Sequence, residues 1–69
     1  MHRRPVESAA VVSVGYDKTQ RILEVEVDGG TVCQYLEVPA REFFALLAAD
    51  SVGRYYNQQI KATYEFRKV

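Results

Sequence analysis

Apolar and polar residues alternate through the first half of the chain, which is the period of a β-strand with one buried face. The clearest case is Leu23 to Val27, in which apolar side chains alternate with two glutamates. A β-branched run from Ala9 to Tyr16 precedes it, and the polar turn 17–20 separates the two segments. We therefore expect two strands here, with Glu24 and Glu26 on the solvent-facing side of the second.

A glycine-containing loop, 28–30, follows the second strand and predicts a hairpin into a third strand from Thr31 to Val38. A three-residue loop, with Gly30 in the left-handed conformation, puts Cys33 and Tyr35 on the apolar face. The cross-strand pairs of this register are Val27 with Thr31, Val25 with Cys33, and Leu23 with Tyr35. A two-residue loop would bury Gln34 instead, so we prefer the first register.

The second half of the chain changes to helical spacing. Pro39 suits the first position of a helix over Ala40 to Ala49. Its apolar face carries Phe43, Leu46 and Leu47. Ser51 is a suitable N-cap for a second helix from about Val52 to Lys61. Its residues at four-residue spacing, which should pack inward, are Val52, Tyr56 and Ile60. On the opposite, solvated side we expect Arg54, Gln58 and Lys61.

The two ends of the chain are less regular. Residues 1–8 indicate an extended N-terminal arm, and the alternating aromatic and charged tail 63–67 indicates a short edge strand or an ordered extension. The expected fold class is α+β, with a three-stranded antiparallel meander followed by two helices and a short C-terminal strand. At 69 residues the chain is expected to be a single domain, 1–69.

Charge is balanced overall but unevenly distributed. Nine basic and nine acidic residues cancel, which removes the general electrostatic argument for a nucleic-acid-binding domain. Residues 1–20 carry a net charge of +1, residues 21–52 carry −4, and residues 53–69 carry +3. The two basic ends would form a basic patch only if they meet in space.

The chain offers few residues for catalysis or metal binding. His2 and Cys33 are the only imidazole and thiol, too few for a structural zinc site, and we expect no metal and no cofactor. Cys33 lacks a histidine that could activate it, and Glu24 and Glu26 read as the wet face of a strand. We therefore expect no enzyme activity. A single cysteine and no membrane-length apolar run favour a cytoplasmic location without membrane contact.

The tyrosines and cations at the chain ends are the candidates for binding, because aromatic rings beside cations can hold unpaired bases. Tyr16, Tyr35 and Tyr56 fall on apolar faces, which leaves Tyr55 and Tyr64 as the rings expected to be exposed. The candidate nucleic-acid-binding residues are Arg3, Arg4, Arg54, Tyr55, Lys61, Tyr64, Arg67 and Lys68. Taken singly, each cation is also an ordinary solubilising charge.

A set of short motifs in this order resembles the KTSC domain. The motifs are Pro5-Val6-Glu7-Ser8, Val14-Gly15-Tyr16-Asp17, Leu23-Glu24-Val25, Tyr35, Val38-Pro39, Ser51-Val52-Gly53, Tyr56-Asn57, Ile60 and Tyr64. This family occurs alone in bacterial and phage proteins and at the C-terminus of some lysyl-tRNA synthetases. The resemblance covers nearly the whole chain. Two positions depart from the family pattern. The first tyrosine of the family's Tyr-x-Tyr motif is replaced by Cys33, in Cys33-Gln34-Tyr35, and the second serine that commonly follows Ser8 is replaced by Ala9.

The resemblance implies little about function beyond an RNA or tRNA partner, suggested by attachment to a tRNA enzyme. The first hypothesis is an RNA-binding accessory module. The second is a protein-interaction or structural module, using a sheet edge or an aromatic patch with Tyr55 and Tyr64, and forming a homodimer. Asn57 either braces a neighbouring turn or meets a ligand. In the motif Cys33-Gln34-Tyr35, a cysteine stands in place of the first tyrosine, which favours packing in the hydrophobic core over base stacking for this motif.

Overall fold

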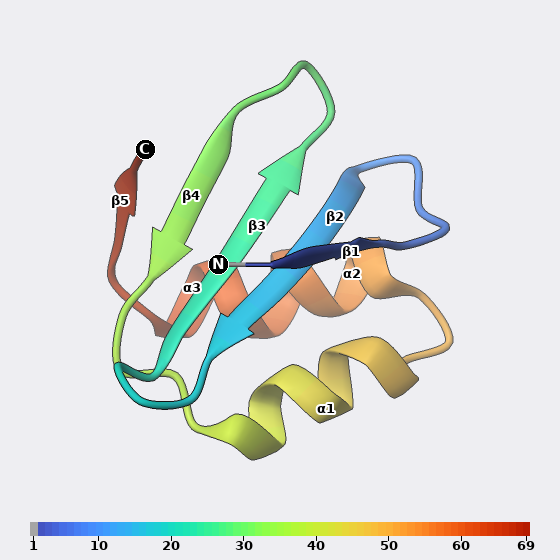
Figure 1. The fold of residues 1–69 in the computed structure, drawn as a ribbon. Helices are drawn as coiled ribbons and strands as arrows, with labels where there is room; N and C mark the ends of the chain where they lie inside the picture. Colours follow the sequence, from blue (N-terminus) through green and yellow to red (C-terminus); the bar gives the residue numbers. More distant parts are fainter. Residues whose placement is uncertain (1) are drawn as a thin grey trace.

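The first half of the chain and its last residues form one antiparallel sheet in the computed structural model, which describes residues 2–69. The strands are β1 (Arg3–Pro5), β2 (Val11–Asp17), β3 (Ile22–Val27), β4 (Val32–Tyr35) and β5 (Phe66–Lys68). They lie in the order β1-β2-β3-β4-β5 (Figure 1). The α+β class is therefore confirmed, and the predicted meander forms the centre of the sheet with one further strand on each side.

The register between β3 and β4 is the one that the three-residue loop predicts. Val25 lies opposite Cys33 and Leu23 opposite Tyr35, while the Val27 amide donates to the Thr31 carbonyl at 2.9 Å. The loop requires glycine because its φ angles are +97° at residue 29 and +90° at residue 30. The predicted strand from Thr31 to Val38 corresponds to β4, which ends at Tyr35 because the chain bends after that residue.

Two helical segments cover the sheet. The first is α1 (Ala40–Ala48), preceded by Pro39 at the N-cap rather than inside the helix. The second consists of α2 (Val52–Tyr55), the π-helical turn η1 (Tyr56–Ile60) and α3 (Lys61–Thr63). Ser51 caps it as predicted, since its side chain accepts from the Arg54 amide at 3.2 Å. The apolar spacing predicts a regular α-helix, and the π-helical turn is the point at which the structure differs from that prediction.

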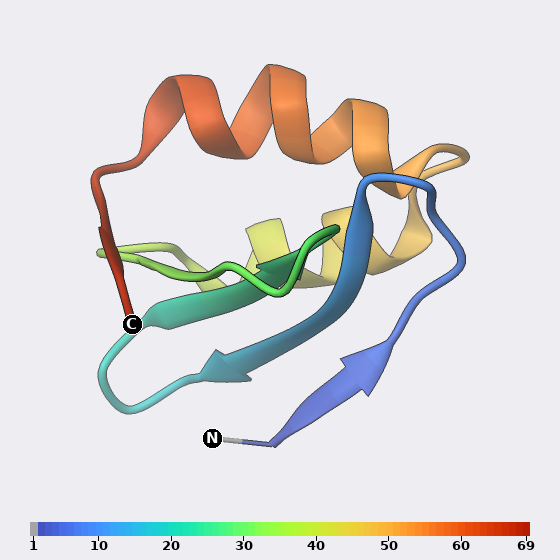
Figure 2. The ribbon, with the colours of Figure 1, turned by 90° about the horizontal axis from the view of Figure 1, so that it is seen from above.

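The core lies between the sheet and the helices. Figure 2 shows the second helical segment on one side of the sheet and β1 on the other. Tyr56 and Ile60 point inward with exposed fractions of 4% and 0%, as predicted from their spacing. Leu46 of α1 is also fully buried, and the Tyr16 ring stacks on Phe43 at 5.3 Å. The buried core residues are Val11, Val14, Leu23, Val25, Cys33, Tyr35, Val38, Leu46, Tyr56 and Ile60.

The predicted N-terminal arm is a strand over part of its length. Its first residue lies outside the described residues, and β1 pairs with β2 so that Arg3 lies opposite Gly15. A Cβ atom on Gly15 would lie 2.5 Å from the His2 carbonyl oxygen, so a residue without a side chain is needed at this close approach. The arm is thus held against the sheet by a contact between distant parts of the chain.

Candidate ligand-binding groove

The two basic ends of the chain lie at opposite edges of the sheet, because β1 and β5 are its first and last strands. The eight candidate residues therefore do not gather in one patch. Two of them, Lys61 and Lys68, line the same hollow, and Arg54 lines a different one near Ser51. Arg4 is exposed on β1.

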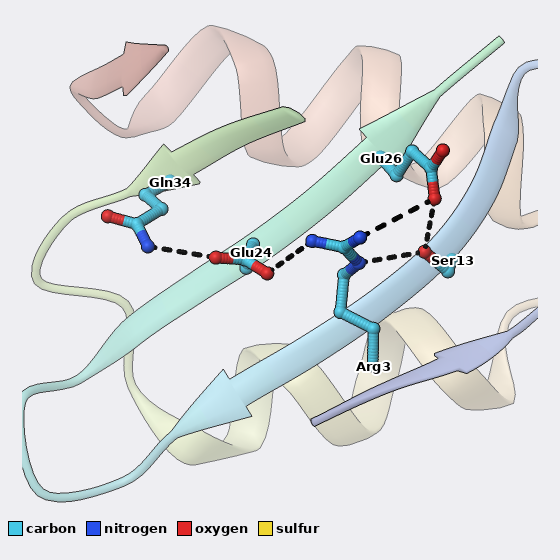
Figure 3. Close-up of polar contacts among 5 residues, drawn as sticks. All are labelled: Arg3, Ser13, Glu24, Glu26 and Gln34. Atoms are coloured by element: carbon cyan, nitrogen blue, oxygen red, sulfur yellow. Dashed lines mark hydrogen bonds and ion pairs between the residues drawn. The ribbon is translucent and has the colours of Figure 1, made fainter. Parts of the chain in front are cut away.

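Arg3 lies in a polar network on the sheet face that β1 covers (Figure 3). Its guanidinium donates to Glu24 at 2.5 Å and to Ser13 Oγ at 3.0 Å, and it lies 3.7 Å from Glu26. Gln34 donates to the other oxygen of Glu24 at 2.8 Å. The arginine is therefore committed to these acceptors, which leaves it poorly placed to contact a phosphate.

Glu24 is buried, at 7% exposed, whereas the strand pattern predicts a solvent-facing side chain. The prediction fails because β1 covers this part of the sheet. Burial by itself would raise the pKa of Glu24, but the hydrogen bonds from Gln34 and Arg3 and the charge of Arg3 together hold the pKa below its usual value. The carboxylate is thus kept ionised inside the network.

Arg67 extends this network to the last strand. It pairs with Gln34 across β4 and β5, and its Nε donates to the Gln34 side-chain oxygen at 3.0 Å. Arg67 alternates with its neighbours along β5, so its side chain lies on the opposite face from Phe66 and Lys68. It is exposed, but it is separated by the sheet from the hollow that Lys68 lines.

Tyr55 and Tyr64 are half-buried rather than exposed, and both hydroxyls donate to Glu42 of α1. The Tyr64 bond is 2.6 Å long. The hydrogen bond to Glu42, followed by burial, raises the pKa of Tyr55. Burial, followed by the hydrogen bond and the charge of Glu42, raises the pKa of Tyr64 to about 12. These rings join α1 to the second helical segment and are not a free aromatic surface.

The hollow beside β5 is an apolar groove of about 330 Å³. We call it the β5 groove, and its lining residues are Ala10, Val27, Cys33, Tyr35, Tyr56, Asn57, Lys61, Phe66 and Lys68. Lys68 lies opposite Cys33, and Phe66 opposite Tyr35, in the β4–β5 ladder, so all four side chains share the helix-facing side of the sheet. The groove thus lies between the end of the sheet and the second helical segment.

Aromatic side chains form the floor of the β5 groove. The Tyr35 and Tyr56 hydroxyls share a hydrogen bond of 2.6 Å, and the two rings meet edge to face at 5.8 Å. Burial and the shared hydrogen bond raise the pKa of Tyr35, and burial raises that of Tyr56 although the bond to Tyr35 acts in the opposite direction. The floor is therefore neutral at physiological pH. Phe66 tilts over Tyr35 at 5.3 Å with half of its surface exposed.

The π-helical turn brings Lys61 to this groove. At about 100° per residue, an α-helix would place residues 56 and 61 about 140° apart. The wider turn, in which the Lys61 amide donates to the Tyr56 carbonyl, brings them closer, and Lys61 Nζ lies 5.9 Å from the centre of the Tyr56 ring. The prediction that Arg54 and Lys61 share one solvated face is therefore wrong. π-Helical turns occur frequently at functional sites.

Phe66 and Asn57 also line this groove, and of the two only Asn57 is considered as a ligand contact from the sequence. The alternation of aromatic and charged residues in 63–67 was the available signal for Phe66, because it predicts a strand with one aromatic face. Asn57 is exposed and lines the groove, which favours the ligand-facing alternative for its side chain. Cys33 is buried at 6% exposed, as its register predicts.

The electrostatic character of the β5 groove is cationic. Lys61 and Lys68 are its only charged lining residues among residues 2–69. Within the same range neither ammonium group lies at ion-pair distance from a carboxylate. The arrangement can therefore hold an anionic group at the rim and an apolar or aromatic group below it. No cluster of three or more metal-binding side chains occurs in the described chain.

Comparison with known proteins gives a consistent family match. The KTSC domain matches residues 7–64. An uncharacterized protein of Stutzerimonas stutzeri is 46% identical over 61 residues, covering 88% of this chain and 86% of that protein. A protein of Tsukamurella paurometabola is 45% identical over 58 residues, covering 84% and 87%. The crystal structure of a KTSC domain protein from Yersinia pestis superimposes with a TM-score of 0.92 at 38% identity, covering 99% of this chain and 96% of that one.

Proposed function

We propose that this chain, which belongs to the KTSC domain family, is a non-enzymatic module that binds single-stranded RNA. The family match names no activity, so the proposal rests on the residues of the β5 groove. The observation that carries the proposal is the pair Lys61 and Lys68, which come from different elements and line one groove together with the half-exposed ring of Phe66. Two cations beside an aromatic ring suit a strand whose phosphates and bases are both accessible.

The size of the cationic site sets the expected strength of binding. Each phosphate contact to a single strand contributes about −0.7 to the slope of log affinity against log salt. With two contacts, a fourfold rise in salt should weaken binding about sevenfold. Because the chain carries no net charge, there is no general attraction to add to this local term. Binding should therefore be weak and strongly dependent on salt.

The test is a fluorescence-anisotropy titration of the domain with single-stranded RNA and with tRNA at about 50 and 200 mM salt, a range over which phosphate contacts weaken measurably. The test variant is Lys61→Ala with Lys68→Ala. The matched control is Lys18→Ala with Arg54→Ala, which removes the same charge from exposed positions outside the groove. Saturable binding that only the groove variant abolishes supports the proposal, while absence of binding at low salt refutes it.

A second candidate function, protein interaction, is favoured by the free side of β5. All three residues of this edge strand are exposed, and Phe66, Arg67 and Lys68 combine an apolar ring with two cations. Pairing with a second copy of β5 would bring like charges together, which is unfavourable. The edge therefore suits an acidic extended peptide better than a homodimer. Analytical ultracentrifugation that gives a dimer at micromolar concentration would contradict this preference.

A further inference from the structure

We propose that the β5 groove binds one unpaired nucleotide, with its base inserted beside Phe66 and its phosphate between Lys61 and Lys68. This inference rests on the proposed function and narrows it from a strand to a single nucleotide position. It also predicts that a free nucleoside monophosphate binds, which contact with an RNA backbone alone does not require.

The apolar lining of the groove indicates that an apolar part of a ligand can rest against it. Its volume of about 330 Å³ falls in the range of small-molecule sites. Its floor is formed by Cys33, Tyr35 and Tyr56, each no more than 6% exposed. Backbone phosphates alone would need only surface cations, so the apolar lining would contact nothing without an apolar or aromatic part of the ligand.

The rim of the groove defines the charge and the polar contacts of that ligand. Lys61 and Lys68 provide two ammonium groups that, among the described residues, lie within ion-pair distance of no carboxylate, which suits a phosphate group. The side-chain amide of Asn57 offers both a donor and an acceptor at the same rim. An aromatic ring system with polar edges and an attached anion matches this combination.

The base must be unpaired to enter. In an A-form helix the bases are stacked and paired, so a ring cannot be inserted beside Phe66 without leaving the helix. Stacking of one base on an aromatic side chain typically contributes about 1–3 kcal/mol, which corresponds to about 5-fold to 150-fold in affinity. Phe66 is 51% exposed and therefore keeps ring surface available for this contact. Duplex RNA should bind much more weakly than a single strand.

The test is an NMR titration of the isotope-labelled domain with AMP, UMP, ribose 5-phosphate and inorganic phosphate. Both nucleotides should shift the amide signals of Cys33 and Asn57 and bind at least about 10-fold more tightly than ribose 5-phosphate, because only they carry a base. Equal binding of ribose 5-phosphate or phosphate would overturn the inference, since the apolar floor would then contribute nothing. Absence of any shift would overturn it as well.

A pair of phenylalanine variants separates this inference from the proposed function. Phe66→Leu keeps an apolar side chain but removes the flat ring, and should weaken nucleotide binding about 10-fold. Phe44→Leu is the control, because Phe44 is 64% exposed on α1, outside the groove. If RNA binding is insensitive to Phe66→Leu, the proposal of an RNA-binding module stands and the proposal of a nucleotide site in the groove is wrong. If the domain binds nucleotides but not RNA, the nucleotide site stands and the proposal of an RNA-binding module is wrong.

Discussion

Replacement of Glu42 by alanine tests the contact that joins the two helical segments. Its carboxylate accepts from the hydroxyls of Tyr55 and Tyr64, and no other side-chain bond among residues 2–69 links α1 to the second helical segment. A hydrogen bond to a charged group contributes about 1.5–3 kcal/mol. Because both rings are half-buried, we take the lower figure for each, so Glu42→Ala should cost about 3 kcal/mol.

That loss is large for a chain of this size. At about 0.05–0.15 kcal/mol per residue, the whole domain has a free energy of unfolding of about 3–10 kcal/mol. A loss of about 3 kcal/mol should lower Tm by about 12–24 °C. Thermal unfolding followed by circular dichroism measures the shift. Glu7→Ala, at an exposed glutamate, is the control and should change stability by less than about 0.5 kcal/mol.

A double-mutant cycle decides whether the hydrogen bonds are the cause. Tyr55→Phe and Tyr64→Phe should each cost about 1.5 kcal/mol in the native chain and almost nothing when Glu42 is already alanine. Equal costs in both backgrounds would refute the reasoning. The pKa of Tyr64 gives a second check, because a raised folded-state value means that this stabilisation is complete below pH 10 and is lost as pH rises toward 12. In Glu42→Ala, Tyr64 should ionise nearer pH 10 by absorbance titration.

Three further perturbations follow from the contacts that the N-terminal segment, residues 2–8, makes with the rest of the chain. Gly53→Ala should destabilise the domain by about 1 kcal/mol in chemical denaturation although alanine favours helices, because the new Cβ would lie 2.9 Å from Ser8 Oγ. This cost should be smaller in a Ser8→Ala background, although Ser8→Ala is itself destabilising because Ser8 Oγ accepts from the Ala10 and Val11 amides. Gly15→Ala should cost about 2 kcal/mol and remove hydrogen-exchange protection from β1, and unchanged protection would contradict the contact with His2. Arg3→Ala should cost about 1–2 kcal/mol at pH 7. Because the pKa of Glu24 is depressed, this cost should shrink as pH falls below 4.5, and a cost independent of pH would contradict it.

The sheet centre and the helices could be predicted because their signals are local. The register of β3 and β4 follows from one loop and from the penalty of burying Gln34, and the inward face of the second helical segment follows from four-residue spacing. Ser51 was identified as a cap by its residue type alone. Each of these depends on residues within a few positions of one another.

The features that were missed depend on contacts between distant residues. Arg3 and Glu24 are 21 positions apart, and nothing near either residue indicates that β1 will cover the glutamate. Glu42 likewise reaches Tyr64 across 22 positions, which turns an expected surface ring into part of the helix packing. The π-helical turn at Tyr56 carries no residue pattern of its own, yet it determines that Lys61 faces the β5 groove. The candidate cations therefore do not form one surface.

An NMR titration with single-stranded RNA at about 50 mM salt, where phosphate contacts are strong, tests the binding surface most directly. The largest amide shifts should fall on the β5 groove, at Cys33, Asn57, Lys61, Phe66 and Lys68. They should disappear in the variant with alanine at residues 61 and 68, while the spectrum remains that of a folded domain. Shifts centred on Arg4 or Arg54, or no shifts at all, would contradict the assignment of the groove.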